Sequence, residues 1–130
     1  MYRLSKTFRF SAAHVLEGLD DPRHPCGRVH GHNYEITLSL SSSTLDGSGF
    51  VADTRRLDFV RSFIADCLDH QNLNETLPEL RGQTTGENIA SHLYQWVQDH
   101  SPESGDRSVQ ALLSSVRVCE TPTVCVEYQR

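Results

Sequence analysis

The seven residues 26–32 read Cys-Gly-Arg-Val-His-Gly-His and carry two histidines one residue apart. On an extended chain, side chains at positions i and i+2 point to the same face. His30 and His32 can therefore hold one metal ion if this segment enters a strand. Gly31 between them adds no side chain to the backbone. The segment predicts a strand that begins near residue 30, with a metal site at its start.

Alternating apolar and polar residues lie on both sides of this segment. Residues 34–40 alternate directly after it, and residues 2–10 alternate before it, with His14 continuing the apolar parity of the earlier run. If the two strands pair antiparallel, the end of the first lies beside the start of the second. His14 then meets His30 and His32 across the sheet. Three imidazoles with an open fourth position are the ligand set of a catalytic zinc site.

The rest of the chain predicts two helices and a hairpin. Residues 54–69 contain no Gly or Pro and show a helical apolar stripe after Asp53, which can act as the N-cap. Residues 84–87, Thr-Thr-Gly-Glu, have capping-box spacing before a helix that runs to about residue 100. Residues 116–121 and 124–129 alternate around a turn. The order ββααββ predicts one α+β domain over residues 1–130, a four-stranded antiparallel sheet with two helices on one face.

Composition excludes some classes of protein. A formal charge of −5 argues against a protein that coats nucleic acid. No apolar run is long enough to span a membrane, and the first residues lack the apolar core of a signal peptide, so we expect a cytoplasmic protein. We therefore expect the four cysteines to be reduced. Cys119 and Cys125 can face each other across the hairpin, where packing or a chance cross-strand pair is a simpler explanation than function.

Each candidate site residue has a simpler alternative. The histidines can be solvated, or they can form a closed structural zinc site with Cys26. Cys26 can also be a packed thiol, or a nucleophile or acid–base group with a pKa lowered by nearby zinc and imidazoles. Asp69 and His70 can shuttle a proton, although a histidine at a helix C-terminus is also favoured by the helix dipole.

The acidic and basic candidates point to a ligand with several polar groups. Glu120 shares the apolar parity of its strand, so it either anchors adjacent N–H donors of a ligand or sits half in water at the strand end. We expect Glu120 and the three histidines to project to the helix side, near one end of the sheet. Thr84 and Thr85 are candidate substrate contacts, but a role as helix caps is the simpler explanation for both. Arg28 can meet an anionic group or belong to a solvated loop.

These residues resemble the family of 6-pyruvoyl-tetrahydropterin synthase and 6-carboxy-tetrahydropterin synthase (QueD). The motifs that carry the resemblance are Phe10-Ser11-Ala12-Ala13-His14, the segment 26–32, Leu68-Asp69-His70, Thr85-Gly86-Glu87-Asn88-Ile89-Ala90 and Glu120-Thr121. The spacing of three residues between the cysteine and His-Gly-His resembles that of the QueD branch. The chain departs from the family at Thr54, where Phe is more frequent, and at Thr84, where bacterial relatives often have Pro.

The resemblance implies a tunnelling fold (T-fold), in which subunits join their sheets into a barrel, commonly a homohexamer of two stacked trimers with active sites between subunits. It implies zinc on His14, His30 and His32, and a pterin held by Glu120. The proton-transfer groups that it implies are Cys26, Asp69 and His70.

The resemblance also implies a reaction. 7,8-Dihydroneopterin triphosphate would give 6-carboxy-5,6,7,8-tetrahydropterin, acetaldehyde and triphosphate, a step toward queuosine and other 7-deazapurines. The alternatives are a 6-pyruvoyl product, cleavage of a related pterin side chain, and a zinc-stabilised module that binds a pterin or purine without turnover.

Overall fold

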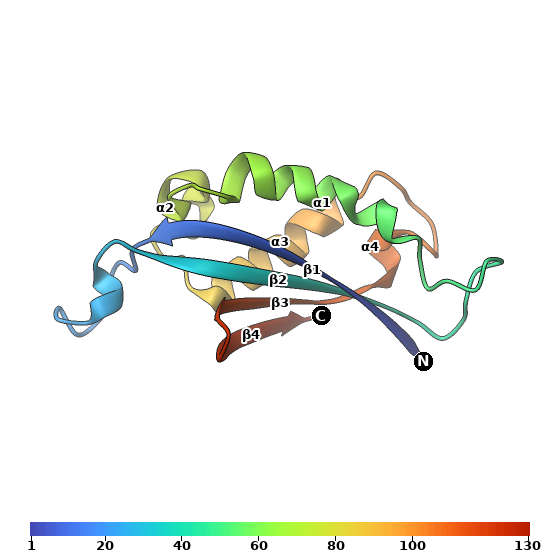
Figure 1. Ribbon diagram of the computed structural model, residues 1–130, viewed down its shortest axis with the longest axis horizontal. Helices are drawn as coiled ribbons and strands as arrows, with labels where there is room; N and C mark the ends of the chain where they lie inside the picture. Colours follow the sequence, from blue (N-terminus) through green and yellow to red (C-terminus); the bar gives the residue numbers. More distant parts are fainter.

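A four-stranded antiparallel sheet forms one layer of the computed structural model, which describes all 130 residues (Figure 1). The strands follow chain order in the sheet, which confirms the predicted topology. Their bounds are β1 (Tyr2–His14), β2 (His30–Ser42), β3 (Leu113–Thr121) and β4 (Val124–Gln129). The helices cover one face of this sheet, so the fold is α+β as predicted.

The helical layer is more varied than the sequence predicts. The expected helix over residues 54–69 is a continuous run of three geometries: a 3₁₀ turn at Thr54–Leu57, α1 (Asp58–Phe63) and a π-helical segment at Ile64–Leu68. Asp53 begins it as predicted, because its side chain accepts the backbone N–H of Arg55. The other long helix is α3 (Gly86–His100). Two helices of one turn each, α2 (Leu73–Thr76) and α4 (Val109–Leu112), are not predicted from the sequence.

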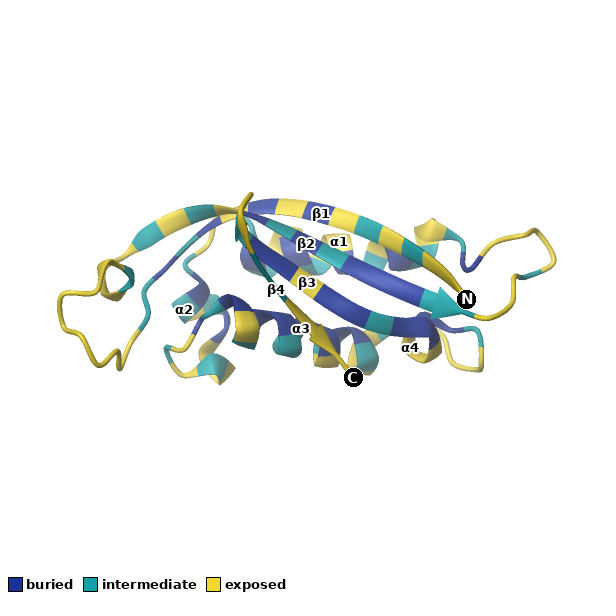
Figure 2. Ribbon diagram, turned by 90° about the horizontal axis from the view of Figure 1, so that it is seen from below, coloured by how far each residue is buried: buried dark blue, intermediate teal, exposed yellow.

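The core lies between the sheet and these helices. Strand alternation turns every second side chain toward the helices, and the central strand β2 contributes Tyr34, Ile36, Leu38 and Leu40, all at most 1% exposed. Figure 2 shows the alternation of buried and exposed residues along β1. Burying an aliphatic or aromatic side chain of this size contributes about 1.5–3 kcal/mol.

The opposite face of the sheet is polar. Cross-strand pairs run along β1 and β2, with the hydroxyls of Thr7 and Thr37 2.8 Å apart and Arg9 Nε donating to Glu35 Oε1 at 2.9 Å. Such pairs stabilise a half-exposed antiparallel sheet. None of the helices has the length and apolar content needed to cross a membrane.

Two local predictions are wrong. The N-cap of α3 is Thr85, whose hydroxyl accepts the N–H of Asn88, so the capping box predicted from Thr84 is displaced by one residue. Cys119 and Cys125 form a disulfide, which overturns the expectation of four reduced cysteines. The register of β3 and β4 pairs these two residues directly, with their Cα atoms 4.0 Å apart.

Candidate functional site

Three histidines meet where β1 ends and β2 begins. The register sets His14 opposite His30, and His32 follows two residues later on the same face. Their ring centroids are 4.5 Å (His14–His30), 4.8 Å (His30–His32) and 5.1 Å (His14–His32) apart. One nitrogen from each ring lies within 4.8 Å of the others, so this group can hold a metal ion.

The hydrogen bonds of two rings determine which nitrogen faces the centre. His14 Nδ1 lies 2.8 Å from the backbone oxygen of Thr84, and His30 Nδ1 lies 2.7 Å from that of Arg28. A carbonyl oxygen only accepts, so Nδ1 carries the proton and Nε2 keeps its lone pair. The Nε2 atoms of all three histidines are buried and without a hydrogen-bond partner. A buried nitrogen with a free lone pair is what a metal ligand requires, so the residues fit a bound divalent metal.

The electrostatics favour the neutral, ligating form of His14 and His32. Burial lowers the pKa of His14, opposed by its hydrogen bond to Thr84 and assisted by the neighbouring His30. Burial also lowers the pKa of His32, opposed by Glu120. Neutral imidazoles at neutral pH bind a metal without first releasing a proton.

Glu120, on β3, lies beside the group of three histidines. Its Oε2 lies 3.9 Å from His32 Nε2, and it projects to the helix side, as the strand parity predicts. Its Oε1 lies at the start of α3, 3.3 Å from where a Cβ on Gly86 would stand. A larger residue at position 86 would press on this carboxylate. Glu120 is therefore seated between the histidines and the N-terminus of a helix.

Asp69 and His70 lie beside the last part of β1. Asp69 Oδ1 accepts the backbone N–H of Ser11 at 3.0 Å and lies 3.0 Å from His70 Nδ1. The Ser11 N–H and then His70 lower the pKa of Asp69. His70 has a positive φ of 60°, an uncommon conformation for a residue with a side chain, held by its N–H bond to the Ser11 oxygen at 2.6 Å. Its side chain is 83% exposed and lines, with His32, a pocket of about 550 Å³.

The other predicted site residues lie outside the metal-binding group, and two of them support it. Cys26 lies in a 3₁₀ turn at Pro25–Gly27, within the loop that extends past the end of the sheet (Figure 1), and it is not part of the metal-binding group. Arg28 supports His30 through its backbone oxygen. Thr85 caps α3, while Thr84 is fully buried beneath His14. This placement favours a supporting role for Thr84 over the substrate contact that we predicted.

Two residues near the histidines are not predicted from the sequence. Tyr34 is 1% exposed, stacks on Phe10 at 4.9 Å, and has a buried hydroxyl without a partner. Its position two residues after His32 was the only signal in the sequence. Asn74 bonds the backbone of Val15, directly after His14. No local pattern marks Asn74, because its partner lies 59 residues away.

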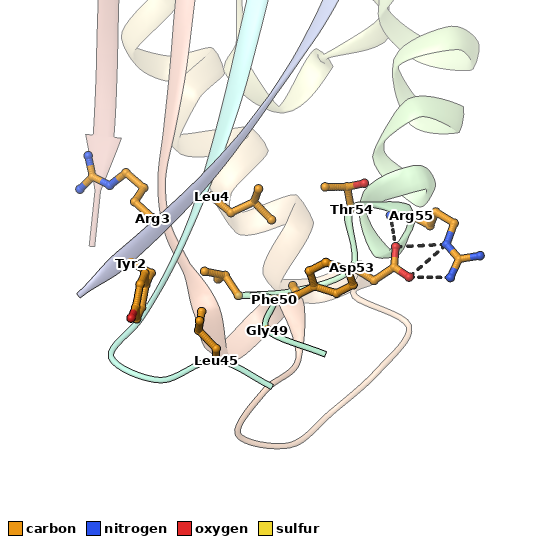
Figure 3. Close-up of a pocket in the computed structure, with 11 residues that line it drawn as sticks. Tyr2, Arg3, Leu4, Leu45, Gly49, Phe50, Asp53, Thr54 and Arg55 are labelled. Carbon is orange, nitrogen blue, oxygen red and sulfur yellow. Dashed lines mark hydrogen bonds and ion pairs between the residues drawn. The ribbon is translucent and has the colours of Figure 1, made fainter. Parts of the chain in front are cut away.

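A larger cavity lies at the opposite end of the sheet. It measures about 750 Å³ and is lined by the start of β1 and the loop after β2, including Tyr2, Leu45 and Phe50 (Figure 3). Figure 3 shows the Asp53–Arg55 ion pair at its rim. Because His14 pairs with His30 at one end of β1 and Tyr2 pairs with Ser42 at the other, this cavity is remote from the histidines.

Known proteins resemble the whole chain. The family model described as 6-pyruvoyl tetrahydropterin synthase matches residues 3–130. A 6-carboxy-5,6,7,8-tetrahydropterin synthase of Haemophilus influenzae is 28% identical over 151 residues, covering 99% of each chain. A 6-pyruvoyl tetrahydrobiopterin synthase of Dictyostelium discoideum is 31% identical over 106 residues, covering 80% of this chain and 73% of the other. The solved structure of Caenorhabditis elegans 6-pyruvoyl tetrahydropterin synthase superimposes with a TM-score of 0.83 at 26% identity, covering 99% and 95% of the two chains.

Proposed function

Because the chain belongs to the 6-pyruvoyl tetrahydropterin synthase family, we propose that it is a zinc-dependent 6-carboxy-5,6,7,8-tetrahydropterin synthase. It would convert 7,8-dihydroneopterin triphosphate and one molecule of water into 6-carboxy-tetrahydropterin, acetaldehyde and triphosphate, on the route to queuosine. The observation that carries this proposal is the group of three unpartnered Nε2 atoms with a carboxylate 3.9 Å from one of them. That arrangement sets a metal site beside an anchor for a ligand with N–H donors.

Zinc on His14, His30 and His32 would polarise the side-chain oxygens of the substrate and lower the pKa of its hydroxyls. Glu120 would accept two N–H bonds from the amino-pyrimidinone edge of the pterin, a bidentate geometry that a carboxylate favours. The position of Glu120 between His32 and the start of α3 supports this role, because the pterin would then lie beside the metal group.

Proton transfer is assigned to His70 and Cys26. The Asp69 carboxylate lies 3.0 Å from His70 Nδ1, so it would orient the ring and stabilise its protonated form. His70 Nε2 is then the atom that exchanges a proton with the substrate side chain. A thiol at Cys26 would serve the opposite side of that side chain. Carbon–carbon cleavage of the retro-aldol type requires both an acid and a base.

We propose that the Cys26 and the Asp69–His70 pair that serve one site come from different subunits. In one chain Cys26 lies in a 3₁₀ turn of the loop between β1 and β2, its backbone oxygen accepts the N–H of Leu16 at 2.8 Å, and its thiol is not part of the metal-binding group. β1 and β4 are the outer strands of the sheet, and the free backbone groups of such edges can pair with another copy. We propose a homo-oligomer, a dimer of trimers, in which this pairing closes a barrel around the polar sheet face. We also propose that each chain acts as one domain, residues 1–130, in the cytoplasm, without nucleic-acid partners.

A second candidate is the 6-pyruvoyl product from the same substrate. The 31% identity to the Dictyostelium protein and the match to the nematode structure favour it as the alternative. Both reactions need the same metal group and the same pterin anchor, so the product separates them.

A product assay tests the proposal. Zinc-loaded protein is incubated with 7,8-dihydroneopterin triphosphate, pterins are followed by mass spectrometry, and acetaldehyde by a coupled dehydrogenase. We expect 6-carboxy-tetrahydropterin and acetaldehyde in equal amounts. Unchanged substrate with folded, zinc-replete protein would reject the proposal, and a pyruvoyl product would select the second candidate.

Three variants separate the roles. His30→Ala should lose bound zinc and turnover together, because it removes one of three ligands. Cys26→Ala should keep zinc and lose turnover. His100→Gln, at the far end of α3, is the matched histidine control and should keep both. Full metal content in His30→Ala would refute the assigned ligand set.

A further inference from the structure

The side chain of Asn74 forms two hydrogen bonds with the backbone of Val15, the residue after His14. Asn74 Oδ1 accepts the N–H of Val15 at 2.9 Å, and Asn74 Nδ2 donates to the Val15 oxygen at 2.8 Å. One amide side chain thus satisfies both backbone groups of the residue that follows a metal-ligand candidate. These two bonds fix which amide atom is oxygen and which is nitrogen.

Thr84 links Asn74 to the imidazole ring of His14 by hydrogen bonds. Its hydroxyl donates to Asn74 Oδ1 at 3.4 Å, which leaves its oxygen lone pairs to accept from His14 Nδ1 at 3.1 Å. The Thr84 backbone oxygen accepts from the same Nδ1 at 2.8 Å. The direction of every bond is determined, and the chain of bonds ends with the lone pair of His14 Nε2 facing the other two histidines.

We propose that Asn74 is a positioning residue of the metal centre, which holds His14 through Val15 on one side and through the Thr84 hydroxyl on the other. This inference rests on the proposed metal role of the histidines and is independent of the reaction that the site performs. It also gives Thr84 a function as a partner of His14 in place of a substrate contact.

The location of Asn74 argues that it acts on the site. Val15 begins the loop that leaves the sheet, because β1 ends at His14. The backbone there no longer has the ladder bonds that hold the rest of the strand. Asn74 satisfies both backbone groups of Val15, the residue next to His14, before the backbone bond of Leu16 to the Cys26 oxygen at 2.8 Å. Replacing such an outer partner of a metal ligand typically weakens metal affinity 10- to 100-fold.

Zinc affinity of the full-length protein tests the inference. Zinc is titrated against a chromophoric chelator for wild type, Asn74→Ala, Thr84→Val and Thr84→Ser, and the melting temperature of each is measured without metal. Asn74→Ala should raise the zinc Kd at least about 10-fold. Thr84→Val should raise it less, because the backbone oxygen at position 84 still accepts from His14. Thr84→Ser, which keeps the hydroxyl, should restore the wild-type Kd.

Asn72→Ala is the matched control. Asn72 accepts the backbone N–H of Asn74 at 3.0 Å and caps α2, so its loss perturbs the same segment without touching the bonds to Val15 or Thr84. We expect a lower melting temperature and an unchanged zinc Kd. Long-range ¹H–¹⁵N spectra of metal-free wild-type protein should show His14 protonated at Nδ1.

Three results would overturn the inference. They are a wild-type Kd in Asn74→Ala, an equal loss of affinity in Asn72→Ala, and a wild type that binds no zinc. If Asn74→Ala does not fold, the comparison of Thr84→Val with Thr84→Ser decides, and equal Kd values there reject the inference. A protein whose zinc affinity depends on Asn74 but which forms no pterin product keeps this inference and loses the proposed function.

Discussion

Replacing Gly86 by alanine should weaken pterin binding while leaving the metal centre intact. Gly86 is the first residue of α3, and a Cβ there would stand 3.3 Å from Glu120 Oε1 and 3.1 Å from Val126 Cγ2. Both distances are tighter than ordinary van der Waals contact, so Glu120 or the backbone must shift by a few tenths of an ångström. The carboxylate is the group that we propose to anchor the pterin.

The expected loss follows from the hydrogen bonds at stake. A bond to a charged group contributes about 1.5–3 kcal/mol, so losing one of the two pterin bonds would raise the Kd about 10- to 100-fold. Stability should change little or rise, because Gly86 has no positive φ and alanine at a compatible position stabilises by about 0.4–1 kcal/mol through the unfolded state. Zinc affinity should be unchanged, since Glu120 is not among the proposed ligands.

Titration with neopterin, followed by its fluorescence, measures the pterin Kd of zinc-loaded protein. Glu120→Gln should reproduce the loss. Gly47→Ala is the control, because a Cβ there meets nothing within 4 Å. An unchanged neopterin Kd in Gly86→Ala, together with a weakened one in Glu120→Gln, would show that the carboxylate tolerates the contact. An unchanged Kd in both would remove Glu120 as the anchor.

Three further results are expected. Burial lowers the pKa of His14 and His32, so the unfolded chain binds more protons than the folded chain below about pH 6.5. Metal-free protein should therefore lose stability on acidification from pH 7 to 5. A melting temperature that does not fall over this range would contradict the expectation. The Cys119–Cys125 disulfide spans a separation of six residues. Its reduction by a dithiol should lower the free energy of unfolding, measured in urea, by about 2 kcal/mol. The free energy of unfolding of Cys125→Ser should not change on addition of reductant. Ile36→Ala, in the middle of β2 and 1% exposed, should cost about 2–5 kcal/mol in the same assay without changing the residual zinc Kd of folded protein.

Strand parity makes the metal group predictable from the sequence. Whether a residue faces the core depends only on its position in the alternation, so the spacing of His14, His30 and His32 is enough to assign them to one face. Antiparallel pairing of the two strands brings the end of the first beside the start of the second, and the structure pairs His14 with His30. The same parity places Glu120 on the helix side.

The supporting contacts were not predictable, because they depend on segments distant in sequence. Asn74 meets Val15 across 59 residues, and Thr84 meets His14 across 70. Thr84 has the better capping pattern in the sequence, because Glu87 lies three residues later, yet Thr85 is the N-cap and Thr84 is buried beneath His14. The disulfide depended on the β3–β4 register, which shifts directly after Cys119.

The site residues are most buried around His14 and Thr84 and least buried around His70. His14 and Thr84 are at most 1% exposed, and the bonds that hold them come from the same chain. His70 is 83% exposed on its side chain, and Cys26 lies in the projecting loop. A metal site whose ligands are buried or half-buried and bonded within one chain can exist in a single chain. Proton transfer by an exposed imidazole and a half-buried thiol needs a surface that holds both groups against the substrate. We therefore expect that dissociation of the assembly removes turnover before it removes metal, because only the exposed side of the site depends on a neighbour.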